Sequence, residues 1–144
     1  MFCAIAAGAA PASVVVDDGV ALAFMDIRPW RRGHVLVVPR AHGVRLGDVT
    51  AEARAAVFAL ASELSIAVRA CGLPCDDVNL IVNDGPAAGQ TVAHAHAHVV
   101  PRVRGDVWRV TTLIIGRVLP PAPRAQLDDD ARAIAAALAR VRGR

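Results

Sequence analysis

Apolar and polar residues recur along this chain with two different periods, which predict strands in some segments and helices in others. Short β-branched and apolar runs bounded by Asp, Gly or Pro predict five strands. A turn at Asp17, Asp18 and Gly19 predicts that the first two strands form a hairpin. The five runs are "SVVVDDG" (13–19), "VALAFMDI" (20–27), "HVLVVPR" (34–40), "DVNLIVNDG" (77–85) and "TVAHAHAHVVPR" (91–102).

Helical spacing is clearest over residues 48–70, where apolar residues recur every third or fourth position after Thr50. A short helix is predicted over residues 2–8, stopped by Gly8. A C-terminal helix is predicted over residues 128–142, with Asp128–Asp130 as an acidic first turn that suits the helix dipole.

One long helix lies between the third and fourth predicted strands, and the strands come in neighbouring pairs. This order predicts an α+β fold: an antiparallel sheet of about five strands, with one long central helix and a C-terminal helix against one face. A chain of 144 residues is the size of one ordinary domain, so residues 1–144 are predicted to form a single domain.

Composition narrows the possible partners of this domain. All sixteen basic residues are Arg, the formal net charge is +3 and aromatic residues make up 3%. Few aromatic side chains are available to stack on bases, so a nucleic-acid partner is not predicted. No apolar run reaches the roughly twenty residues that span a bilayer, so no membrane insertion is predicted. Three cysteines, an odd number, favour reduced thiols and a cytoplasmic location.

The stretch "AHAHAHVV" gathers three of the five histidines, His94, His96 and His98, at every second position. In a strand these side chains would project from one face, with the intervening alanines on the other. Two kinds of chemistry follow. A neutral imidazole can attack phosphorus while its neighbours bind oxygen or donate a proton. Alternatively, three imidazoles and a water suit zinc, although the outer two Cα atoms would lie about 13 Å apart at typical strand rise.

The same stretch resembles the His-φ-His-φ-His-φ-φ signature of the histidine triad (HIT) family of nucleotide-binding hydrolases and transferases. Further blocks resemble this family in the same order, so that the motif-bearing region covers residues 2–106. These blocks are "FCAI" (2–5), "AFMDI" (23–27), "GHVLVVPRAH" (33–42), "IVNDGPAAGQTV" (81–92) and "PRVRGD" (101–106).

The resemblance implies an α+β domain that forms a homodimer, binds a nucleotide and cleaves at the α-phosphorus. It implies that His96 is the nucleophile, that His98 lies near the leaving group, that His94 supports the triad and that His34 completes the site. It also implies that Asp26 grips the ribose. Apolar residues are expected around the base, namely Phe2, Ile5, Phe24 and Ile27. Polar residues are expected at the phosphate, namely Asn83, Gln90 and Thr91.

Two departures from the family pattern bear on metal and specificity. Some relatives hold a structural zinc with a Cys-x-x-Cys pair and two histidines that resemble His42 and His94. Here Cys3 is followed three positions later by Ala6, so no tightly bound zinc is predicted. Arg28 and Arg32 replace more usual residues in "RPWRRGH", which leaves the rim of the pocket, and hence substrate choice, open.

These features predict a nucleotidyl hydrolase or transferase acting on a dinucleoside polyphosphate or a nucleoside phosphoramidate through a nucleotidyl-histidine intermediate. The protein itself requires no metal or other cofactor in this prediction, although a divalent cation can accompany a polyphosphate substrate. Two alternatives stay open: a metal-dependent hydrolase that uses the histidine cluster, and a nucleotide-binding regulatory module with incidental turnover.

Overall fold

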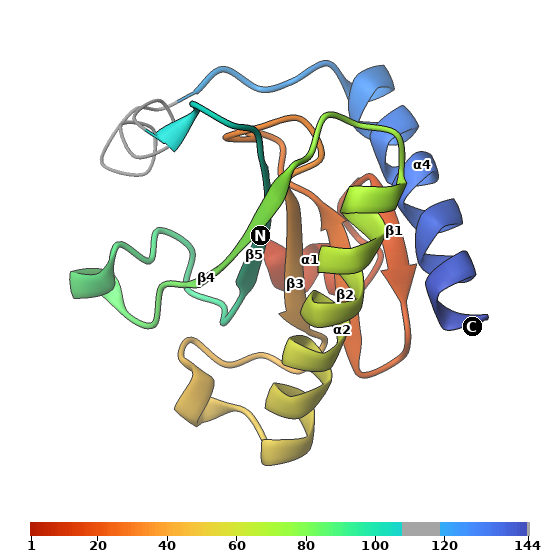
Figure 1. Cartoon of the computed structure of the whole chain (residues 1–144). Helices are drawn as coiled ribbons and strands as arrows, with labels where there is room; N and C mark the ends of the chain where they lie inside the picture. The colour runs from red at the N-terminus through yellow and green to blue at the C-terminus, as the bar shows by residue number, and fades with distance from the viewer. Residues whose placement is uncertain (108–118, 144) are drawn as a thin grey trace.

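The computed structural model describes residues 1–107 and 119–143. Its five strands form one antiparallel sheet in the order β1-β2-β3-β5-β4 (Figure 1). The predicted α+β class with a five-stranded antiparallel sheet is therefore confirmed. The strands are β1 (Val14–Asp17), β2 (Ala21–Met25), β3 (Val35–Pro39), β4 (Asp77–Val82) and β5 (Ala97–Arg102).

The predicted hairpin joins β1 to β2. The Asp18 carboxylate accepts hydrogen bonds from the backbone amides of Val20 and Ala21, and Gly19 has φ +89°. A left-handed backbone is readily adopted by glycine, and an Asp side chain can hold such a turn by bonding to nearby amides. The turn residues therefore act as the sequence predicts.

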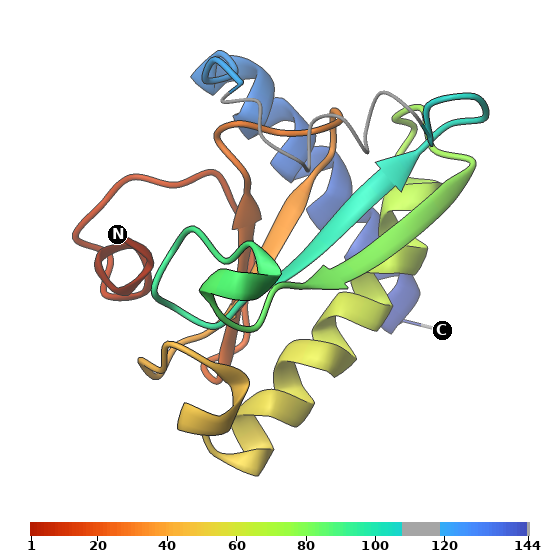
Figure 2. The ribbon, with the colours of Figure 1, turned by 90° about the vertical axis from the view of Figure 1, so that its left-hand side faces the viewer.

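Two long helices, α2 (Ala51–Ala70) and α4 (Arg124–Arg142), cover one face of the sheet (Figure 2). Helix α2 begins as predicted, because the Thr50 hydroxyl accepts a hydrogen bond from the Ala53 amide at 3.1 Å. The apolar stripes of both helices pack on Ala, Val and Met side chains of the sheet and form the main core. No helix in residues 1–107 or 119–143 is both long and apolar enough to cross a bilayer.

Helix α1 (Phe2–Ala6) lies on the opposite face of the sheet from α2 and α4. Phe2 is buried and packs edge-on against Phe24, with ring centroids 5.3 Å apart. Leu22 and Leu36 complete this second apolar cluster. The helix is shorter than the predicted 2–8, and Gly8 with φ +72° follows it. The sheet thus has a partly covered second face on which a cavity can form.

Helix α4 begins at Arg124, one turn before the predicted start at Asp128. Pro123 precedes the helix, and its fixed φ favours a helix start. Leu127 belongs to the buried stripe, so the apolar pattern already extends to this earlier turn. Asp128 accepts a hydrogen bond from the Ser13 hydroxyl, and Asp130 pairs with Arg32. These carboxylates therefore hold α4 to the sheet side of the molecule instead of forming a first turn.

Strand β5 begins at Ala97 and not at residue 91, so of the triad only His98 lies within a strand. The ladder to β3 ends at the pair Val37 and Ala97. Pro39 lies farther along β3 and has no amide hydrogen to continue the ladder. The Ala95 amide instead donates to the Gly43 carbonyl at 2.7 Å. The alternation nevertheless persists before the strand, because Phe2 of α1 contacts the rings of both His94 and His96, and the His96 ring contacts that of His98.

Candidate active site

A cavity of about 770 Å³ lies on the face of the sheet that carries α1. Apolar side chains form much of its wall, and polar side chains from three separate segments enter it. Every site residue predicted from the sequence lines this cavity except His34, His94 and Gln90. The predicted residues that do line it are Phe2, Ile5, Phe24, Asp26, Ile27, Asn83, Thr91, His96 and His98.

A backbone carbonyl determines which ring nitrogen of His96 carries a hydrogen. Its Nδ1 lies 2.7 Å from the carbonyl oxygen of His94, and because a carbonyl can only accept, Nδ1 carries the hydrogen. The neutral ring therefore has its lone pair on Nε2. The ring is buried, lines the cavity and contacts the edge of the Phe2 ring. In its neutral form, the ring therefore offers Nε2 as a nitrogen nucleophile next to the cavity.

His34 and His98 form a hydrogen-bonded pair behind and beside His96. His34 Nδ1 accepts from the Trp30 amide at 3.2 Å, so its hydrogen is on Nε2, which lies 3.0 Å from His98 Nδ1. His98 therefore accepts at Nδ1 and carries its own hydrogen on Nε2. Burial, reinforced by the neighbouring His96, lowers the pKa of His34 to about 3. Burial, with His34 and His96, lowers the pKa of His98 to about 3. Both rings are neutral at physiological pH.

His94 and Gln90 act behind the cavity and not in it. His94 Nε2 donates to the Pro39 carbonyl at 2.9 Å, and burial lowers the pKa of His94 although this bond opposes the shift. The Gln90 amide group donates to the carbonyls of Val44 and Val92, and its oxygen accepts from the Gly85 amide. The Gln90 side chain thus binds the backbone of the loop before the triad and does not line the cavity; its contact with a phosphate stays a prediction.

Asp26 lies at the end of β2 and lines the cavity. One carboxylate oxygen accepts from the Arg28 amide at 2.9 Å, and the other lies 3.6 Å from His34 Nδ1. The second oxygen keeps acceptor capacity for a ligand hydroxyl. The placement agrees with the expected role in binding a ribose.

Trp30 is a site residue that the sequence patterns did not predict, since residues 28–33 carry only the signals of a loop. Its ring stacks on His98, with centroids 4.9 Å apart and an interplanar angle of 16°, and also lines the cavity. One signal could have found it: one of the two tryptophans stands four residues before His34 in a chain with 3% aromatic residues. Leu119 also lines the cavity, although it lies outside the motif-bearing region.

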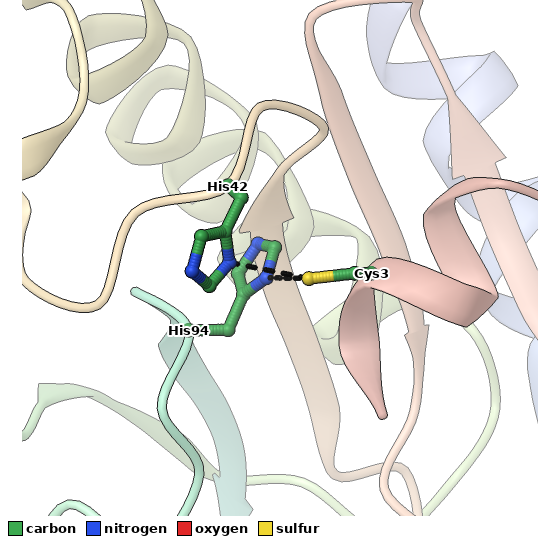
Figure 3. Close-up of side chains that lie close together, drawn as sticks. All are labelled: Cys3, His42 and His94. Carbon is green, nitrogen blue, oxygen red and sulfur yellow. Dashed lines mark hydrogen bonds between the residues drawn. The ribbon is translucent and has the colours of Figure 1, made fainter.

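A second polar cluster lies beside the cavity, behind His96. Cys3 from α1, His42 from the loop after β3 and His94 from the segment before β5 point toward one another (Figure 3). Cys3 Sγ lies 3.2 Å from His42 Nδ1 and 3.4 Å from His94 Nδ1. A histidine whose other nitrogen bonds a backbone carbonyl, as His94 does, is oriented like a metal ligand. Three donor atoms thus converge.

The triad as a whole does not converge on one point. His94 turns toward Cys3 and His42, whereas His98 turns toward His34. Within residues 1–107 and 119–143, no cluster of potential metal ligands contains two members of the triad. The geometry therefore does not favour a metal-dependent hydrolase in which the three alternating histidines hold one ion.

Comparison with known proteins agrees with this geometry. The HIT domain model matches residues 7–105. The chain is 48% identical over 106 residues to a HIT-like protein of Mycobacterium tuberculosis, covering 74% of this chain and 73% of the relative. It is 30% identical over 102 residues to an adenosine 5′-monophosphoramidase of Schizosaccharomyces pombe, covering 71% and 73%.

A solved structure shows the same architecture over nearly the whole chain. This is the zinc-bound histidine triad family protein from Mycobacterium smegmatis, with a TM-score of 0.83 and 39% identity, covering 99% of this chain and 94% of that chain. The family model, the related sequences and the shared fold agree with the histidine arrangement around the cavity. The chain therefore belongs to the HIT family of nucleotide-binding proteins.

Proposed function

We propose that this protein is a nucleotidyl hydrolase or transferase that cleaves a nucleoside 5′-phosphate derivative at its α-phosphorus, with His96 as the nucleophile. The observation that carries the proposal is the 2.7 Å hydrogen bond from His96 Nδ1 to the His94 carbonyl. In the neutral form of the ring, it leaves the Nε2 lone pair as the reactive position. A nucleophile whose other nitrogen is oriented by a third group is the general pattern for covalent catalysis.

The reaction divides into two balanced steps. In the first, the Nε2 lone pair of His96 forms a bond to the α-phosphorus while the bond from phosphorus to the leaving group breaks. The leaving group departs with that electron pair and takes a proton from water in the cavity, while the N–H of His98 Nε2 donates a hydrogen bond to it. In the second, water attacks the same phosphorus and loses a proton to solvent, while the bond from phosphorus to His96 Nε2 breaks and returns its electron pair to the ring, which releases the nucleoside monophosphate. For a transferase, another hydroxyl or amine takes the place of water.

The cavity supports the proposed substrate class. Its apolar side, around Phe2 and Phe24, suits a base, and the Asp26 carboxylate suits ribose hydroxyls. Asn83 and Thr91 are polar groups that can bind phosphate oxygens. The S. pombe relative is named for cleaving a phosphoramidate, and a dinucleoside polyphosphate offers the same nucleotidyl group with a different leaving group. We propose these two compound classes as substrates.

The test follows phosphorus NMR spectra of adenosine phosphoramidate and diadenosine polyphosphates mixed with wild-type protein and with His96→Gly. We expect AMP to accumulate with wild type, in the presence of EDTA for the phosphoramidate, and not with His96→Gly. Turnover that needs an added metal for every substrate would favour the metal-dependent alternative. Binding of AMP without turnover of any compound would favour a regulatory binding module.

We further propose that the cluster of Cys3, His42 and His94 does not bind zinc tightly. Closed structural zinc sites have four protein ligands, and here Ala6 cannot supply the fourth. We expect chelator-dialysed wild type to retain well under one zinc per chain by elemental analysis. Ala6→Cys, which restores the fourth thiolate one helical turn from Cys3, is expected to retain one zinc per chain. Full retention by wild type, or none by Ala6→Cys, would contradict the proposal.

We also propose that the protein is a homodimer. Strand β4 is at one edge of the sheet, and Leu80 on this strand is 48% exposed. Phe58 and Ile66 on α2 are also about half exposed. An unpaired edge strand with exposed apolar residues favours pairing with a second chain. Light scattering should give a mass of twice the chain mass for wild type. The mass of Leu80→Lys should shift toward that of a single chain. A wild type that is monomeric at all concentrations would refute the dimer.

A further inference from the structure

Trp30 contacts both members of the histidine pair but has no role in the two steps of the proposed reaction. Its ring is nearly parallel to the His98 ring and tilted by 35° over the His34 ring, with a centroid distance of 4.9 Å in each case. The side chain is half-buried and lines the cavity. One indole therefore covers His98 on the side from which water in the cavity could approach.

The backbone of Trp30 acts on the same pair. Its amide donates to His34 Nδ1, which fixes the hydrogen of His34 on Nε2. His34 Nε2 in turn lies 3.0 Å from His98 Nδ1, which fixes the hydrogen of His98 on its outer nitrogen. The amide sets the tautomer of both rings, and the indole holds the His98 ring in line with His34.

Two ion pairs hold the loop that carries Trp30, and both involve the arginines that directly follow it. Arg31 lies 3.6 Å from Asp106, which also pairs with Arg102, and Arg32 lies 2.9 Å from Asp130 of α4. The side chains of Asp106 and Asp130 are only 5% and 1% exposed. Buried carboxylates with such partners resist displacement. Arg32, one of the two departures in this loop, therefore points away from the cavity and holds the loop to the C-terminal helix.

We propose that Trp30 is a positioning residue that keeps His98 shielded from water, with its hydrogen on Nε2, where it can donate a hydrogen bond to the leaving group. The effect of Trp30 on turnover rests on the proposed function, whereas its effect on the His98 ring does not. The ionisable groups that face His98 are His34, His96 and Asp26. Burial is the largest cause of the lowered pKa of His98, so removal of the indole should raise that pKa by admitting water.

The test uses three substitutions of Trp30 and a spectroscopic readout without substrate. Trp30→Phe keeps an aromatic ring on His98, Trp30→Leu keeps apolar volume without a ring, and Trp30→Ala removes both. All three keep the backbone amide. Nitrogen-15 spectra of histidine-labelled protein measure the tautomer and titration of each ring. Val20→Ala, an exposed change in the turn between β1 and β2 that does not line the cavity, serves as the matched control.

In wild type, in Trp30→Phe and in the control Val20→Ala, we expect His98 to remain neutral, with the hydrogen on Nε2, down to about pH 5. In Trp30→Ala and Trp30→Leu we expect its titration midpoint to rise toward the ordinary value of about 6.5. For these two variants the pH profile of kcat should change around that midpoint, whereas the wild-type profile should show no such change there. If Trp30 served only as part of the cavity wall, these substitutions would instead raise KM and leave the pH profile unchanged.

Unchanged His98 spectra in Trp30→Leu would overturn the inference, and this variant answers the question even if Trp30→Ala does not fold. Because the spectra need no substrate, they test the role of Trp30 independently of the reaction. Wild type that turns over no nucleotide would refute the proposed function, while the spectra would still decide whether the indole protects His98.

Discussion

Replacing His96 by glycine is expected to lower kcat/KM for adenosine phosphoramidate by about 10⁴-fold or more, because loss of a covalent nucleophile removes the whole first step. The glycine leaves space beside the cavity where the imidazole ring stood, lined by Phe2 and His98. Free imidazole should enter this space and restore part of the turnover. The measurement is initial rate as a function of added imidazole.

The control is His42→Gly, which removes an exposed imidazole that does not line the cavity. It should keep activity within a few-fold of wild type, with no response to imidazole. Activity of His96→Gly close to wild type would remove His96 from the central role. A large loss in His96→Gly without any rescue would contradict the predicted space for free imidazole, although not the loss of the nucleophile.

Acidification is expected to destabilise the fold strongly between about pH 6.5 and pH 3, because His34 and His98 are neutral in the folded state with pKa values of about 3. The unfolded chain binds protons at an ordinary histidine pKa of about 6.5, so it gains protons first as the pH falls. The free energy of unfolding should therefore fall by about 1.4 kcal/mol per pH unit for each of the two rings. From pH 6.5 to pH 5 this is about 2 kcal/mol for each histidine.

Urea unfolding at a series of pH values measures this loss. The double variant His34→Asn, His98→Asn should show a much flatter dependence, because it lacks both buried imidazoles. A wild-type free energy of unfolding that is constant between about pH 7 and pH 5 would contradict the neutral, buried pair.

Local sequence signals predicted most elements of the fold. Thr50 caps α2, Asp18 and Gly19 form the hairpin turn, and the apolar runs form the five strands. The misplaced boundaries have tertiary causes. β5 starts late because Pro39 cannot continue the ladder and Gly43 takes the Ala95 amide. α4 starts early because Leu127 joins the core, and α1 lies on the second face because Phe2 packs on Phe24.

The candidate site was predicted largely through family motifs, and its interior connections were not. Alternation alone put three histidines in one row, whereas the structure gives them separate partners: Cys3 and His42 for His94, the backbone for His96, and His34 for His98. Gln90 satisfies loop carbonyls, which no short-range pattern reveals. The part played by Trp30 depends on ion pairs to Asp106 and Asp130, far away in the sequence.

The central claim is that His96 Nε2 forms a covalent bond to the α-phosphorus. The most direct measurement is rapid acid-free quenching of wild type with adenosine phosphoramidate, followed by intact-mass analysis and mapping of the modified peptide. We predict a transient adenylyl group on His96 that forms as the amine leaves and decays as AMP appears, and that is absent in His96→Gly. AMP production without any adduct, or an adduct on another residue, would contradict the account.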